Sequence, residues 1–77
     1  MNNNQFSIYP NPSSGIINVN ASGKIDVVKV TNLLGQLIYE ARPEQEKISF
    51  ELKYEGIYFI TVTSGERVTT QKIIVSH

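Results

Sequence analysis

The chain has 77 residues, 40% of them hydrophobic, and seven Asp and Glu balance seven Lys and Arg. The basic residues are scattered singly, so they form no stripe that could neutralise nucleic-acid phosphates or bind an anionic membrane surface. The absence of cysteine excludes disulfides, thiol nucleophiles and thiolate metal sites. We therefore expect one small soluble domain with no nucleic-acid partner, no transmembrane helix and no signal peptide.

Apolar and polar residues alternate in short segments separated by turn-forming residues, and no segment keeps a helical period. This pattern predicts seven strands, at residues 6–9, 17–20, 28–31, 36–40, 48–52, 58–63 and 68–75. Each strand has an apolar face that a second sheet can bury, so we expect an all-β antiparallel sandwich. The expected core residues are Ile17, Val19, Val28, Val30, Ile48, Phe50, Tyr58, Ile60 and Val62.

The first strand ends abruptly in FSIYPNPSSG, residues 6–15. Pro10 and Pro12 cannot donate to a sheet ladder, and each favours an extended conformation in the residue before it. The strand is therefore expected to end here as an edge strand, with residues 13–15 turning into the second strand. The prolines explain this segment structurally, and a binding role for Asn11 is the alternative.

Glycines mark the later turns, because a positive φ costs glycine little. Gly35 is expected in the left-handed region of the turn after the third strand, and Gly56 at a second turn that the backbone determines. Ser64-Gly65 is the clearest hairpin turn. The segment ARPEQE, residues 41–46, is the longest expected polar loop.

The aromatic residues are expected to have two roles. Tyr58 begins an inner strand, where its ring can be buried while its hydroxyl bonds a nearby backbone group. Tyr9, Tyr39 and Phe59 alternate to the opposite faces of their strands. There they face water or, if they cluster, form a surface for a partner.

The segment Lys72-Ile73-Ile74-Val75 places three adjacent apolar residues close to the last residue, although chain termini are usually polar and loose. Such a run exposes hydrocarbon on both faces of a strand. Two interpretations stay open: a central strand that is covered on both faces, or a strand whose outer face serves a partner.

Catalytic and metal-binding chemistry has little support. The single histidine, His77, is the last residue, where a general base is poorly held. Asp26 is the only aspartate, and the glutamates fall on loops or polar faces. No calcium-loop pattern, histidine pair or cysteine offers a metal site. We expect no enzyme activity, no metal and no cofactor.

Four motifs follow one another in a specific order: PNP before a glycine, a strand and turn with glycine, a Gly-Ile-Tyr triplet, and a lysine before an apolar strand. The residues that carry them are Pro10, Asn11, Pro12, Gly15, Gly35, Gly56, Tyr58 and Lys72. With these motifs the chain resembles the type A C-terminal sorting domain of type IX secretion cargo (Por secretion family) over residues 6–75. Residues 6–77 are therefore expected to form the sorting domain, and residues 1–5 a disordered linker or leader.

The resemblance implies a seven-stranded, immunoglobulin-like sandwich at the C-terminus of a larger exported protein of the Bacteroidota. The implied partners are an N-terminal cargo domain in the same chain, the type IX secretion translocon with its outer-membrane shuttle proteins, and a sortase-like cysteine peptidase that removes the domain. The cargo would cross the periplasm and then be secreted or stay at the cell surface, commonly joined to an anionic lipopolysaccharide. The domain would be a monomeric substrate and not a catalyst. The translocon would recognise the last strand at Lys72, Ile73, Ile74 and Val75.

Two other functions are compatible with the same fold. One is an immunoglobulin-like or fibronectin-like spacer or adhesion module of a surface protein. The other is a small carbohydrate-binding sandwich that stacks tyrosines on sugars, which requires two or three coplanar aromatic rings on one face.

Overall fold

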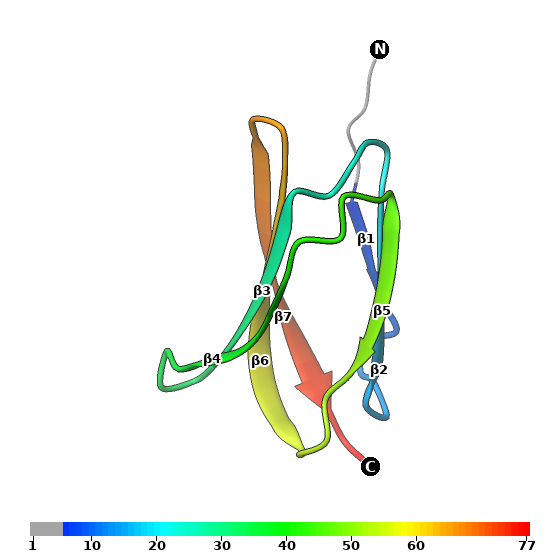
Figure 1. Cartoon of the computed structure of the whole chain (residues 1–77). Helices are drawn as coiled ribbons and strands as arrows, with labels where there is room; N and C mark the ends of the chain where they lie inside the picture. The colour runs from blue at the N-terminus through cyan, green and yellow to red at the C-terminus, as the bar shows by residue number, and fades with distance from the viewer. Residues whose placement is uncertain (1–5) are drawn as a thin grey trace.

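The computed structural model describes residues 6–77, which form seven strands in two antiparallel sheets and contain no helix (Figure 1). The strands are β1 (Phe6–Tyr9), β2 (Ile16–Ala21), β3 (Val27–Asn32), β4 (Leu37–Ala41), β5 (Lys47–Glu51), β6 (Gly56–Ser64) and β7 (Arg67–Val75). The predicted all-β sandwich is therefore confirmed. The expectation of a linker at residues 1–5 lies outside the described residues.

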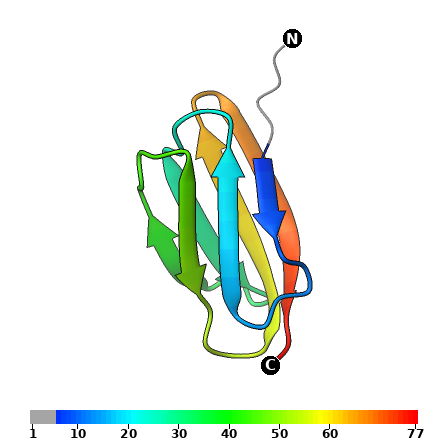
Figure 2. The same cartoon turned by 90° about the vertical axis from the view of Figure 1, so that its right-hand side faces the viewer.

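The three-stranded sheet has the order β1-β2-β5, and the four-stranded sheet has the order β4-β3-β6-β7. The fourth strand thus pairs with the third, whereas in immunoglobulin constant domains it joins the other sheet. The edge strands β1 and β7 lie on one side of the sandwich, and β4 and β5 on the other (Figure 2). The first and last strands of the domain are therefore neighbours in space.

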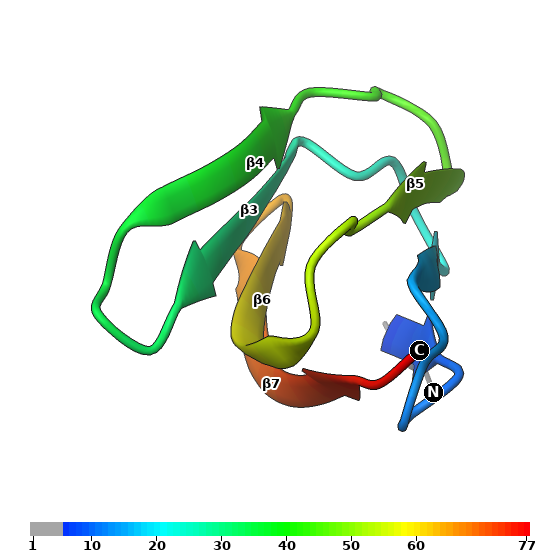
Figure 3. The ribbon, with the colours of Figure 1, turned by 90° about the horizontal axis from the view of Figure 1, so that it is seen from below.

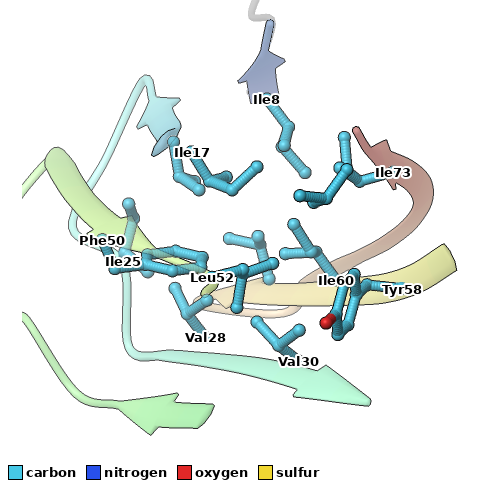
Figure 4. Packing of buried hydrophobic residues seen from close by; sticks show 13 residues of the cluster. Ile8, Ile17, Ile25, Val28, Val30, Phe50, Leu52, Tyr58, Ile60 and Ile73 are labelled. Carbon is cyan, nitrogen blue, oxygen red and sulfur yellow. The ribbon is translucent and has the colours of Figure 1, made fainter. Parts of the chain in front are cut away.

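Alternating residues of both sheets fill the space between them, as their period of two requires (Figure 4). Eight of the nine expected core residues are buried, and the ninth, Ile48, is partly buried and packs against them. The sequence did not identify five further core residues: Ile8, Ile25, Leu52, Ile73 and Val75. Ile25 lies outside the strands, where no alternation marks a buried residue, and Leu52, the last residue of the predicted strand 48–52, lies just after the end of β5 at Glu51.

The turns follow the glycines closely. Gly35 has a φ of 82° and Gly56 a φ of 152°, so the positive φ expected of Gly35 is confirmed and Gly56 has one too. The hairpin between β6 and β7 is formed by residues 65–66 and not by Ser64-Gly65, because Ser64 pairs with Arg67 as the last residue of β6. The longest connection is the β1–β2 segment, residues 10–15, rather than ARPEQE.

The prediction for Tyr39 is wrong, because Tyr39 is partly buried and packs against the core. A bulge in β4 shifts the register between Val30 and Thr31, so Tyr39 pairs with the buried Val30. The Tyr39 ring stacks on Phe50 with centroids 4.4 Å apart. Tyr58 is confirmed as a core residue whose hydroxyl donates to a backbone carbonyl oxygen, that of Tyr54, at 2.7 Å.

Candidate functional site

The terminal strand β7 is an edge strand. It pairs with β6 along its whole length, from Arg67 opposite Ser64 to Val75 opposite Gly56, and no other strand flanks it in the sheet. The interpretation as a central strand covered on both faces is therefore wrong. Its inner face is covered by the core, while its outer face is open, as the second interpretation requires.

The structure divides the four residues that the sequence singled out in this strand. Ile73 is fully buried and Val75 is 2% exposed, so both side chains belong to the core. Lys72 is exposed and Ile74 is 41% exposed on the outer face. Only Lys72 and Ile74 offer side chains that another molecule can reach in the folded domain.

Two residues of β6 extend this surface. Ile74 pairs with Ile57, and Lys72 pairs with Phe59, so the four side chains are cross-strand neighbours. Ile57 and Phe59 are partly exposed. We call these four residues the outer terminal face. Phe59 was expected to face outward, and Ile57, two residues before it in β6, lies on the same face by the same alternation.

The PNP segment contacts the edge of β7 instead of merely ending β1. The Asn11 side-chain Nδ2 donates to the Lys72 carbonyl oxygen at 3.1 Å, and the Ile74 N–H donates to Asn11 Oδ1 at 3.3 Å. Two residues further along the chain, the Ser13 N–H donates to the Ile74 carbonyl oxygen, and the Ser76 N–H donates to the Ser13 carbonyl oxygen, both at 2.8 Å. We call Asn11 and Ser13 the clasp. In Figure 3 the end of β7 runs to this segment.

The clasp is held by its own loop. Ser13 is 2% exposed, and its hydroxyl donates to the Ile16 carbonyl oxygen at 2.7 Å and accepts the Gly15 N–H at 2.9 Å. Gly15 has a φ of 128°, and a Cβ there would lie 3.2 Å from the Leu52 carbonyl oxygen and 3.0 Å from the His77 ring. The chain therefore needs glycine here both for its conformation and for its close packing.

The remaining motif residues shape the backbone at the other turns. The Asn32 Oδ1 accepts the N–H groups of Leu34 and Gln36 at 2.9 and 3.0 Å, which closes the turn that contains Gly35. Gly56 begins β6 opposite Val75, so it lies at the end of the terminal strand. Gly35 is thus separate from the clasp, whereas Gly56 adjoins the strand that the clasp holds.

The charged side chains of residues 6–77 form one ion pair. Within residues 6–77 no three His, Cys, Asp or Glu side chains gather into a possible metal site, and no helix is long and apolar enough to cross a membrane. The Arg42 and Glu40 side chains form an exposed ion pair at 3.1 Å, which contributes little in water. His77 donates its backbone N–H to Glu55 Oε2 at 3.1 Å, and its ring lies against Gly15.

Open grooves lie at two places on the described surface. One groove of about 520 Å³ lies at the β6–β7 hairpin beside Lys24 and Asp26, and Asp26 accepts the Gly65 N–H there at 2.7 Å. Two others, about 350 and 220 Å³, share Ile38, Tyr54 and Tyr58 beside the β3–β4 turn. The walls of these two grooves are mostly apolar. The groove at the hairpin is instead lined mainly by polar and charged residues, and its Ser64 hydroxyl donates to the Lys24 carbonyl oxygen at 2.6 Å.

Comparisons with known proteins agree with the motif order. A protein-family model described as the secretion system C-terminal sorting domain matches residues 7–76. No curated protein matches the chain.

Proposed function

Because the chain belongs to the family of secretion system C-terminal sorting domains, it is a sorting signal of type IX secretion, and we propose that it delivers a cargo fused before it. The cargo would pass through the periplasm of a member of the Bacteroidota and reach the cell surface or the medium. The observation that carries this proposal is the family match over residues 7–76, nearly the whole described domain.

The proposed partners follow from the same membership. The translocon and its outer-membrane shuttle proteins would bind the folded domain, and a sortase-like cysteine peptidase would remove it from the cargo. Members of this family are generally not catalysts, and we propose that this domain is likewise the substrate of the peptidase.

We propose that recognition reads the outer terminal face, with Lys72 and Ile74 as its principal side chains. Ile74 exposes an apolar side chain near the cation of Lys72 on the exposed outer face of β7. Ile73 and Val75 would act indirectly, because their burial fixes the strand to the core. The motif residues Pro10, Pro12, Gly15, Gly35, Gly56 and Tyr58 would shape the backbone.

The carbohydrate-binding alternative is not favoured by the positions of the aromatic residues. Tyr9 belongs to β1 in the three-stranded sheet, and Phe59 belongs to β6 in the other sheet. Tyr54 lies in the β5–β6 loop, and Tyr39 is partly buried and stacks on Phe50. These rings do not share one sheet face on which a sugar could stack. The spacer alternative has the same fold, so the export experiment below distinguishes it from the sorting function.

The test is a fusion of residues 6–77 behind a folded reporter and a periplasmic export signal, expressed in a bacterium that has type IX secretion. We expect the reporter at the cell surface or in the medium, measured by protease accessibility of intact cells. A host without the secretion system is the control. Retention of the unchanged fusion in the periplasm of a competent host would refute the sorting role and favour the spacer.

The role of the outer terminal face is tested with a Lys72→Ala and Ile74→Ala double variant of the same fusion. The far-ultraviolet circular dichroism should stay native, because neither side chain is part of the core, while the reporter should remain in the periplasm. Ile16→Ala is the matched control, since Ile16 is 48% exposed on the other sheet. Delivery of the double variant at the parent rate would refute recognition through this face and leave the sorting role intact.

A further inference from the structure

The edge of β7 carries backbone groups that a neighbouring strand would normally bond. In this domain the side chain of Asn11 bonds two of them, because a carboxamide has the same donor and acceptor as a peptide group. Its Nδ2 donates to the Lys72 carbonyl oxygen, and its Oδ1 accepts the Ile74 N–H. Both bonds join residues more than 60 positions apart in the chain. One side chain therefore replaces a short piece of strand at this edge.

The main chain of Ser13 continues the pairing toward the C-terminus. It forms a parallel bridge with Val75 and bonds the Ile74 carbonyl oxygen and the Ser76 N–H. Counted with the Asn11 bonds, four hydrogen bonds hold residues 72, 74 and 76 on the edge side of β7. Ile73 and Val75 lie between these residues in the strand, and their side chains are buried in the core.

Terminal strands usually fray, and a frayed strand presents its side chains in many arrangements. The clasp instead forms hydrogen bonds with the backbone of Lys72 and Ile74, which are the two most exposed residues of the outer terminal face. From this geometry we infer that Asn11 is a positioning residue: it holds Lys72 and Ile74 in one arrangement for the secretion machinery without contacting that machinery. The inference rests on the proposed sorting function and adds a requirement to it.

The exposed position of Asn11 separates this inference from a general effect on folding. Asn11 is not part of the core, so its side chain can be shortened without opening a cavity. Asn18 offers a matched control. Its Nδ2 donates to the Tyr9 carbonyl oxygen at 3.3 Å and its Oδ1 accepts the Ser49 hydroxyl at 2.7 Å, so it also makes two side-chain hydrogen bonds, but none to β7.

The experiment compares Asn11→Ala with Asn18→Ala in two measurements. Amide hydrogen exchange of the isolated domain should be about tenfold faster at Ile74 in Asn11→Ala, the size expected for one lost hydrogen bond, and unchanged at Val62 in the centre of the sheet. In the reporter fusion, Asn11→Ala should lower surface delivery several-fold. Asn18→Ala should leave both the Ile74 exchange rate and the delivery at parent values.

Three results would overturn the inference: an unchanged Ile74 exchange rate, an equal rise at Ile74 and Val62, or delivery of Asn11→Ala at the parent rate although Ile74 exchanges faster. In each of these cases the delivered parent fusion would still support the sorting function. A parent fusion that stays in the periplasm would instead refute the sorting function, and the positioning role together with it.

Discussion

Phe50 connects the two sheets on the side of the sandwich opposite the clasp. It belongs to β5 in the three-stranded sheet, and its ring stacks on Tyr39 of β4 in the four-stranded sheet at an interplanar angle of 18°. The ring is 8% exposed and packs in the core cluster. Aromatic pairs of this kind contribute more than the area they bury.

Phe50→Ala is expected to lower the free energy of unfolding by about 3 to 5 kcal/mol, because it leaves a cavity and removes the stacking partner of Tyr39. A domain of this size has a total stability of only about 5 kcal/mol, so the variant should be close to unfolded. Urea denaturation measures the change, with Val68→Ala on the exposed part of β7 as control. An unchanged midpoint would contradict the burial of Phe50.

Gly15 and Gly35 provide a second comparison of single residues. Both have a positive φ, 128° and 82°, but a Cβ at Gly35 would meet nothing within 4 Å, whereas one at Gly15 would meet the Leu52 carbonyl oxygen and the His77 ring. Gly35→Ala should therefore cost about 1 kcal/mol from backbone strain alone, and Gly15→Ala more than that. Thermal unfolding of the two variants measures the difference, and equal costs would show that the packing around Gly15 relaxes freely.

The sequence predicted where the strands lie better than it predicted which face of a strand each side chain occupies. All seven were predicted, because each alternates with a period of two between turn residues, and Val28 and Val30 of β3 lie on the expected face. Tyr39 was placed on the wrong face, because a bulge in β4 adds one residue that alternation cannot reveal. The contact of Asn11 with β7 was also missed, because it depends on pairing between distant segments and not on any local pattern.

The terminal strand should be indispensable to the fold. Removal of Ile73–His77 takes away two core side chains, leaves part of the β6 ladder unpaired, and removes the partners of the clasp at residues 74 and 76. The truncated domain should show no cooperative unfolding transition, whereas removal of Ser76 and His77 alone should preserve one. Circular dichroism during heating distinguishes these results. A cooperative transition in the longer truncation would show that β7 is dispensable for folding.

The whole domain has equal numbers of acidic and basic residues, and a single ion pair, which is exposed, occurs within residues 6–77. Its stability should therefore come from apolar burial and backbone hydrogen bonds, with little contribution from charge. We expect the same urea midpoint at low and high sodium chloride, a monomer in sedimentation analysis, and no change in melting temperature with divalent metals. A midpoint that falls clearly at high salt would point to a stabilising charge network.

The adjacency of β1 and β7 has a consequence for the order of events during synthesis. The first strand leaves the ribosome well before the last one. The clasp lies in the loop after β1, yet its hydrogen-bond partners are Lys72, Ile74 and Ser76. The sandwich therefore cannot close until the end of β7 at Val75 has emerged, and its many contacts between distant segments slow the closure further. Any domain encoded upstream would therefore have time to fold before the sorting domain does.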